Sequence, residues 1–186
     1  MRPLIVTAFV TADGAMEAPG GGDHRSAGWT FKTVEFDEAV YEIKGREQKE
    51  ATALLVGRMT YEEFAPVWPT MEEVAEYNAM PRYVVSSTLE QDDARWPATI
   101  LHSLDEVAAL KETEGGPILV HGSAGLGASL ADAGLVDRYH LLVFPVLLGA
   151  GKRLFSATDK PLTKLTLTEH EVYSNGIMKQ VYDVVH

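Results

Sequence analysis

Glycine, hydroxyl and guanidinium groups follow three short apolar runs of the sequence, each at the point where a strand would end. The three segments are Gly57-Arg58-Met59-Thr60, Ser86-Ser87-Thr88 and Gly122-Ser123-Ala124-Gly125-Leu126. The carboxyl ends of parallel strands meet at one edge of a sheet, and open α/β sheets bind ligands there. We therefore expect the three segments to lie together and to form a binding site.

The chemistry that these segments suit is the binding of phosphate groups. A helix N-terminus exposes unpaired N–H groups and a partial positive charge, and glycine lets a phosphate approach the backbone closely. Arg58 adds a guanidinium, and Ser86 and Ser87 add hydroxyl donors. An adenosine 2′-phosphate would use this Arg-plus-hydroxyl cluster, so NADP fits better than NAD. Either glycine segment alone could simply turn the chain, and neither matches the G-x-G-x-x-G fingerprint.

Candidates for the substrate side come from other parts of the chain. Asp13 ends the first apolar run beside Gly14 and is the candidate catalytic residue, although Asp-Gly is also an ordinary turn pair. Trp29 and Trp68 could form the walls of an aromatic pocket, or could pack in the core. The glycine-rich loop 14–33 would act as a lid over the substrate.

Elements that would position these residues alternate along the chain. Apolar residues at 36, 40 and 43 predict a helix over 36–50, in which residues 42–50 form a mixed-charge face with no function assigned to it. Capping-box patterns predict helices that begin near Thr60, Thr70 and Ser103. Strand–helix alternation followed by three strands indicates an α/β fold: a mostly parallel sheet, helices on both faces and an antiparallel C-terminal hairpin.

Composition excludes several classes of function. The chain of 186 residues has an ordinary content of apolar and charged residues, which predicts a single domain over 1–186. Its formal charge of −11 opposes binding to nucleic acid or to an anionic membrane. There is no cysteine, which suits a cytoplasmic location, and no metal-ligand spacing among the six histidines. We expect no transmembrane segment and no metal.

Over nearly its whole length the sequence resembles the dihydrofolate reductase-like superfamily, and within it the bacterial RibD C-terminal domain family. The resemblance rests on an ordered series of motifs: Asp13-Gly14, Leu54-Leu55-Val56-Gly57-Arg58-Met59-Thr60-Tyr61, Trp68-Pro69, Val84-Val85-Ser86-Ser87-Thr88-Leu89, Gly122-Ser123-Ala124-Gly125-Leu126, Leu135-Val136-Asp137, and Pro145-Val146-Leu147-Leu148-Gly149-Ala150-Gly151 with Leu154-Phe155. The family often has glutamate where this chain has Arg138.

This resemblance implies a dihydrofolate reductase-like fold, a homodimer and an NADPH site. The family's cofactor contacts would fall on Gly57, Arg58, Thr60, Ser86, Ser87, Gly122, Ser123, Ala124, Gly125 and Leu126. The implied reaction is hydride transfer to a C=N or C=O carbon of a small heterocyclic or sugar-linked substrate. It is similar to the 5-amino-6-(5-phosphoribosylamino)uracil reductase step of riboflavin biosynthesis. Dihydrofolate reductases carry an acidic residue on the first helix, and Asp37, near that region, joins the expected substrate pocket.

Two alternatives remain open from the sequence. The first is an NADP-binding module without catalysis, which would keep the cofactor segments alone. The second is a serine hydrolase, in which Ser123 would be the nucleophile and Asp159 and His170 would complete a triad. In that case His121 would replace the first glycine of the G-x-S-x-G pattern.

Overall fold

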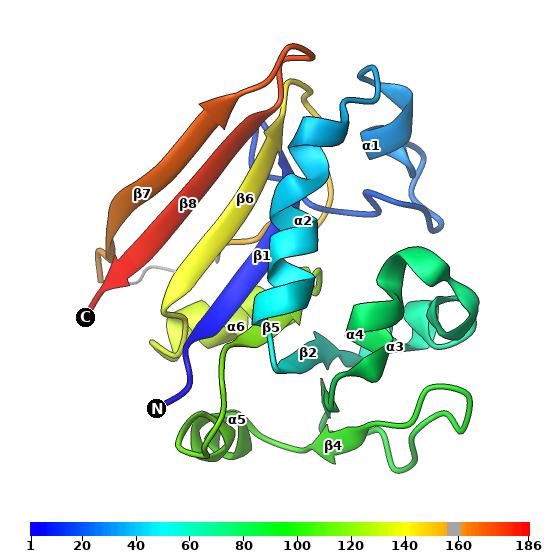
Figure 1. Cartoon of the computed structure of the whole chain (residues 1–186), viewed down its shortest axis with the longest axis vertical. Coiled ribbons are helices and arrows are strands. Elements are labelled where there is room, and N and C mark those ends of the chain that lie inside the picture. Colours follow the sequence, from blue (N-terminus) through cyan, green and yellow to red (C-terminus); the bar gives the residue numbers. More distant parts are fainter. Residues whose placement is uncertain (156–160) are drawn as a thin grey trace.

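A single eight-stranded sheet forms the centre of the computed structural model, which describes residues 1–155 and 161–186 (Figure 1). The order across the sheet is β4-β3-β2-β5-β1-β6-β8-β7. The strands are β1 (Leu4–Thr11), β2 (Ala53–Gly57), β3 (Arg82–Val85), β4 (Thr99–Leu101), β5 (Ile118–His121), β6 (Arg138–Phe144), β7 (Lys164–Val172) and β8 (Met178–Val185). The six strands from β4 to β6 pair in parallel, whereas β8 pairs antiparallel with both β6 and β7.

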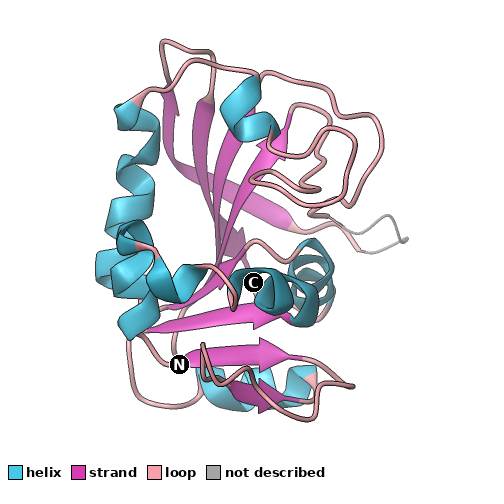
Figure 2. Cartoon of the chain, turned by 90° about the vertical axis from the view of Figure 1, so that its right-hand side faces the viewer, coloured by secondary structure: helices cyan, strands magenta, loops and turns pink. Residues whose placement is uncertain are grey.

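Helices cover both faces of this sheet, as Figures 1 and 2 show. The α-helices are α1 (Trp29–Lys32), α2 (Glu38–Glu50), α3 (Arg58–Phe64), α4 (Ala75–Ala79), α5 (Leu104–Lys111) and α6 (Ala124–Asp132). On one face α5 and α6 pack on β1 through residues such as Val107 and Leu130. On the other face α3 and α4 pack through Tyr61 and Tyr77, and α2 packs through Ile43. The predicted α/β architecture is therefore confirmed.

Alternation along β1 decides which side chains reach which layer. Val6, Ala8 and Val10 belong to the core under α5 and α6, whereas Thr7 and Phe9 lie on the α2 face. These inward positions are nearly all apolar, as expected for a central parallel strand that is covered on both faces. The polar Thr7, which is 1% exposed, is the exception.

The capping roles predicted for Thr60 and Thr70 are wrong, although a helix does begin near Thr60, where α3 starts at Arg58. Thr60 lies inside α3, whose N-cap is Gly57, and its hydroxyl accepts a hydrogen bond from Ser123 instead of capping the helix. Thr70 ends a short 3₁₀ turn (Trp68–Thr70), a second 3₁₀ turn covers Glu72–Val74, and α4 follows. Only the Ser103 pattern is confirmed, because the Ser103 hydroxyl accepts from the Glu106 N–H at 3.3 Å.

The segment 11–33, which includes the predicted loop 14–33, contains helix α1 and is joined to the rest of the molecule. Trp29 is buried and donates its indole N–H to the carbonyl of Glu17 at 2.8 Å. The Glu17 carboxylate accepts from the backbone N–H of Lys152 at 3.0 Å, and the N–H of Met16 donates to the carbonyl of Lys152 at 2.9 Å. These bonds tie the segment to the chain that follows β6.

Within residues 1–155 and 161–186, no helix is long and apolar enough to cross a membrane. The same residues contain no cluster of histidine and carboxylate side chains that could hold a metal ion.

Candidate nucleotide and substrate site

The carboxyl edge of the sheet brings the two glycine segments together. The backbone N–H of Gly57, at the end of β2, donates to the hydroxyl of Ser123 at 2.9 Å. That hydroxyl in turn donates to the Thr60 hydroxyl at 2.9 Å. Ser123 therefore joins the β2–α3 turn to the β5–α6 turn, and the predicted meeting of these segments is found in the structure.

Backbone geometry leaves the start of α6 free for a ligand. Gly122 and Ser123 both adopt left-handed conformations, with φ of 61° and 62°. Ser123 is the N-cap of α6, but its side chain makes no capping bond because it reaches α3 instead. The first amides of this nine-residue helix, including those of Ala124 and Gly125, therefore have no side-chain cap and can meet an anion.

The third segment, Ser86-Ser87-Thr88, lies beside the guanidinium of Arg58. Arg58 donates to the Thr88 hydroxyl at 2.9 Å, so α3 is linked to the chain after β3. Its guanidinium also lies 3.6 Å from Glu62, but this pair is half exposed and contributes about 0–1 kcal/mol. Ser86 is buried, and its hydroxyl accepts the N–H groups of Thr88 and Leu89. Ser86 therefore shapes the turn, whereas Ser87 is exposed.

Asp13 makes contacts that hold a loop in place. Its carboxylate accepts from the Thr11 hydroxyl at 2.5 Å and from the N–H groups of Leu148 and Gly149 at 3.1 and 2.9 Å. These three donors, that of Thr11 first, lower the pKa of Asp13 to about 2. The side chain is thus an anion at neutral pH, bonded across to the segment after β6. Arg153 lies beside it, 3.8 Å from the carboxylate.

The expected pocket residues lie in separate parts of the fold. Trp29 belongs to the core between α2 and β6, where its ring meets Phe144 edge-on at 5.1 Å. Trp68 belongs to the core under α3 and α4 and stacks on Phe64 at 4.0 Å. Asp37 is the N-cap of α2, and its carboxylate accepts from the Ala39 N–H at 3.1 Å. The two tryptophans therefore do not form facing walls of one pocket.

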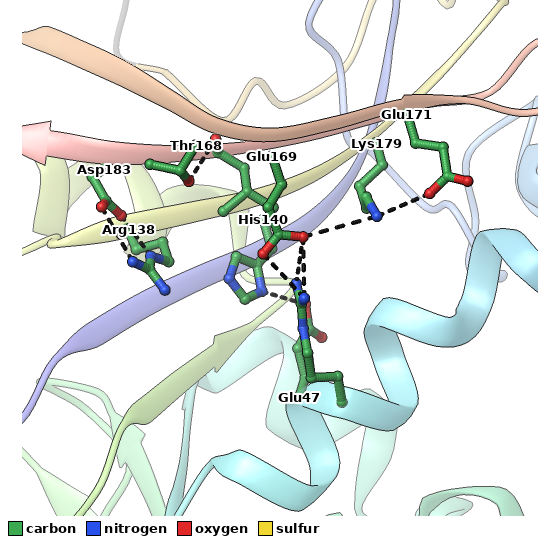
Figure 3. Close-up of polar contacts among 10 residues, drawn as sticks. Glu47, Arg138, His140, Thr168, Glu169, Glu171, Lys179 and Asp183 are labelled. Atoms are coloured by element: carbon green, nitrogen blue, oxygen red, sulfur yellow. Dashed lines mark hydrogen bonds and ion pairs between the residues drawn. The ribbon is translucent and has the colours of Figure 1, made fainter.

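A polar row across the middle of the sheet was missed by the sequence analysis. The register pairs Thr7 of β1 with His121 of β5 on one side and with His140 of β6 on the other. Above this row Glu47 is 3% exposed, although the sequence analysis assigned no function to the mixed-charge face of residues 42–50. Its carboxylate accepts from the Thr7 hydroxyl at 2.7 Å. It also pairs with His140 at 2.8 Å, as Figure 3 shows.

Charges in this row are set by burial and by neighbours. Burial alone would raise the pKa of Glu47. The charges of Lys44 and His140 and the hydrogen bonds from His140 and Thr7 outweigh this effect and lower the pKa to about 2. Burial first, and then the charge of Lys44, lowers the pKa of His121 to about 4. Glu47 is therefore an anion and His121 is neutral at pH 7. The Nδ1 atom of His121 has no hydrogen-bond partner among the described residues.

A shallow hollow lies at the outer end of α2. Its lining residues are Thr30, Phe31, Val34, Glu35, Phe36, Tyr41, Asn175 and Ile177. None of the predicted cofactor or pocket residues is among them, so this hollow does not coincide with the predicted site.

An open, mostly parallel sheet with two glycine turns at its carboxyl edge and an antiparallel C-terminal end defines a dihydrofolate reductase-like α/β protein. The chain belongs to the RibD C-terminal domain family, whose model matches residues 2–179. A relative in Bacillus subtilis (strain 168), the uncharacterized protein YyaP, is 26% identical over an alignment of 190 residues that covers 97% of this chain and 94% of that protein.

Solved structures show the same fold at lower identity. A putative riboflavin biosynthesis protein from Shewanella sp. PV-4 matches with a TM-score of 0.80 and 18% identity over 99% of both chains. The dihydrofolate reductase of Enterococcus faecalis, solved with NADP(H), matches with a TM-score of 0.63 and 16% identity over 99% of this chain and 97% of its own. The Thermotoga maritima deaminase/5-amino-6-(5-phosphoribosylamino)uracil reductase matches with 0.67 and 15%, over 99% of this chain and 57% of its own.

Proposed function

We propose that this protein is an NADPH-dependent reductase that transfers a hydride to a C=N or C=O carbon of a small heterocyclic or sugar-linked substrate. The observation that carries the proposal is the junction of Gly57, Thr60 and Ser123 at the carboxyl edge, beside the uncapped start of α6. Family membership and the NADP(H)-bound state of the E. faecalis neighbour support the same cofactor.

In this arrangement the α6 amides of Ala124 to Leu126 would hold the pyrophosphate. Arg58, with the Thr88 hydroxyl beside it and Ser87 exposed nearby, would hold the adenosine 2′-phosphate. Ser86 would act indirectly, because its hydroxyl is used in the turn that presents Ser87 and Thr88.

The cofactor supplies the hydride, and the chain's own residues bind and orient the reactants. Asp13 holds the residues after β6 against the end of β1, and the segment 11–33 is fixed there by Glu17 and Lys152. These contacts would close one side of the site and exclude water from the reacting atoms. We propose that Asp13 acts through position rather than by proton donation, since its carboxylate is already an anion.

Cofactor binding tests this proposal directly. The Arg58→Ala variant should weaken NADPH binding by about 1–3 kcal/mol, as for a charge-assisted hydrogen bond, and should leave NADH binding nearly unchanged. Arg46→Ala is the matched control, because Arg46 faces Glu169 on β7 instead of the carboxyl edge. Isothermal titration calorimetry measures both cofactors. Equal losses for NADPH and NADH would contradict the position assigned to the 2′-phosphate, and no binding of either would contradict the function.

A non-catalytic NADP-binding module would bind NADPH in the same way. Oxidation of NADPH, followed at 340 nm with carbonyl and imine substrates, separates it from a reductase. The hydrolase alternative has little support, because the Ser123 hydroxyl is bonded to Gly57 and Thr60 instead of a base. His170 lies on β7, four strand positions and about 19 Å from β5. Asp159 falls outside the described residues.

We further propose that the chain forms a homodimer through the outer face of β7 and β8. Leu167 and Val172 are 47% and 71% exposed, and Met178 lies opposite Val172 in the register. Exposed apolar side chains on a sheet edge are a common feature of interaction surfaces. Light scattering should report a dimer for the wild type and a monomer for a Leu167→Asp/Val172→Asp variant. A wild-type monomer at 100 μM would contradict the proposal.

A further inference from the structure

The chain that follows β6 crosses the carboxyl edge of the sheet, and we call residues 147–153 the strap. On one side of the edge, the backbone N–H of Gly149 donates to Asp13, just after β1. On the other side, the ammonium of Lys152 lies 3.8 Å from the sulfur of Met59, in the first turn of α3. Since β5 lies between β1 and β2 in the sheet, the strap spans the place where the two glycine segments meet.

Close packing fixes the backbone on both sides of Lys152. Gly151 has a φ of 128°, and a Cβ added there would lie 2.7 Å from the Cβ of Glu17. Leu154, just beyond the strap, is 1% exposed, and its Cδ1 would lie 3.1 Å from a Cβ added to Gly127 of α6. The fold itself therefore holds residue 152 at the carboxyl edge.

The ammonium of Lys152, in contrast to its backbone, is weakly held. It lies 3.3 Å from one carboxylate oxygen of Glu17, in a half-exposed pair of the kind that contributes little to stability. Its other neighbour among the described residues is the thioether sulfur of Met59, which is a weak acceptor. The second carboxylate oxygen of Glu17 accepts from the backbone N–H of Lys152 at 3.0 Å. The ammonium can therefore change partners while the strap stays attached to Glu17.

The proposed cofactor carries more negative charge than the residues assigned to it neutralise. Arg58 is assigned to the 2′-phosphate, and the start of α6 offers the dianionic pyrophosphate only amides and a partial charge. A chain with a formal charge of −11 also repels a polyanion at long range. The charge of Arg153 is already used, because its guanidinium donates to the carbonyl of Asp13 and lies 3.8 Å from the Asp13 carboxylate. Lys152 is the remaining cation of the strap.

We propose that Lys152 is a cofactor-binding residue, whose ammonium moves from Glu17 to the pyrophosphate of the bound nucleotide. This inference rests on the proposed function, because the pyrophosphate at the start of α6 is part of that function. A phosphate oxygen is a stronger acceptor for an ammonium than a thioether is, so the exchange favours binding. The backbone bond from Lys152 to Glu17 remains, so the segment 11–33 stays in place when the cofactor binds.

Calorimetry on the full chain with NADPH, NADH and inorganic pyrophosphate tests this exchange. Lys152→Met removes the charge, and Lys152→Arg keeps it. Lys49→Met is the matched control, because Lys49 is an exposed lysine in the last turn of α2. Glu17→Gln removes the competing charge and keeps an oxygen that can accept from the backbone N–H of Lys152. Thermal unfolding confirms that each variant is folded.

Lys152→Met should weaken NADPH and NADH binding by the same factor, roughly tenfold, as for the loss of a charge-assisted hydrogen bond. This equal loss separates Lys152 from Arg58, whose replacement should affect NADPH alone. Lys152→Arg should keep most of the affinity, and Lys49→Met should keep all of it. Glu17→Gln should raise the affinity for both nucleotides, and the gain should vanish when Lys152→Met is also present.

Unchanged nucleotide affinity in Lys152→Met overturns the proposal, and so does a loss that is confined to NADPH. An equal gain from Glu17→Gln with and without Lys152 contradicts the exchange of partners. If NADPH and NADH both fail to bind the wild type, the proposed function is wrong, and inorganic pyrophosphate decides the role of Lys152. A loss of pyrophosphate affinity in Lys152→Met then keeps Lys152 as an anion-binding residue. No loss, or no binding of pyrophosphate to the wild type, overturns that role as well.

Discussion

Replacement of Glu47 by glutamine tests how the buried row on the α2 face stabilises the fold. The carboxylate is 3% exposed, and its pKa is lowered from 4.5 to about 2 in the folded protein. A lowered pKa of this size corresponds to about 3 kcal/mol of stability, present above pH 4.5 and lost as the pH falls towards 2. Glu47→Gln should therefore lower the free energy of unfolding by about 3 kcal/mol at pH 7, and the difference from wild type should shrink towards zero near pH 2.

Urea unfolding followed by tryptophan fluorescence suits this measurement. Trp29, Trp68 and Trp96 are 2%, 8% and 2% exposed, so unfolding changes the surroundings of all three. Glu42→Gln, an exposed residue of the same helix, is the control and should change the unfolding free energy by less than about 0.5 kcal/mol.

The reasoning depends on the pH dependence as well as on the size of the effect. Other carboxylates with lowered pKa values, such as Asp13 and Asp93, also make the wild type less stable in acid. They are present in both proteins, so the difference between wild type and Glu47→Gln isolates Glu47. A difference that stays constant from pH 7 to pH 3, or one below about 1 kcal/mol at pH 7, would refute the account.

Two further substitutions test the carboxyl edge. Gly122→Ala should lower the free energy of unfolding by about 1–2 kcal/mol, because φ of residue 122 is 61°, and it should weaken NADPH binding. Thermal unfolding measures the first effect and calorimetry the second. An unchanged melting temperature would contradict the strained turn. Asp13→Asn should lower the melting temperature, because two N–H groups after β6 lose a charged acceptor. The same variant should keep the wild-type shape of the pH profile of kcat, and the loss of an inflection would show that Asp13 donates a proton.

The meeting of the two glycine segments at the carboxyl edge was predictable from the sequence because each of its parts is local. An apolar run followed by Gly57-Arg58 or by Gly122-Ser123 already contains the strand end, the turn and the helix start, and parallel pairing then brings them together. The helix start near Thr60 was right, since α3 begins at Arg58, but the capping role of Thr60 was wrong. Its hydroxyl has a tertiary partner, Ser123, that no local pattern contains.

The polar row could not be predicted in the same way. Thr7, Glu47, His121 and His140 are brought together by the register of three strands and the rotation of α2, which no short motif specifies. One indication was nevertheless present: Glu47 continues the apolar spacing of residues 36, 40 and 43. A carboxylate on the buried stripe of a helix requires partners, and that requirement predicts a polar site beneath it.

The charge states around the site also restrict the source of the proton that a reduction consumes. Asp13 and Glu47 have pKa values of about 2, so both are anions that cannot donate at neutral pH. His121, with a pKa of about 4, is already neutral and is not a strong acid either. None of these three residues is therefore an acid matched to neutral pH, as a general acid should be. Under the proposed function, the protein would contribute position, and the proton would come from solvent or from another group.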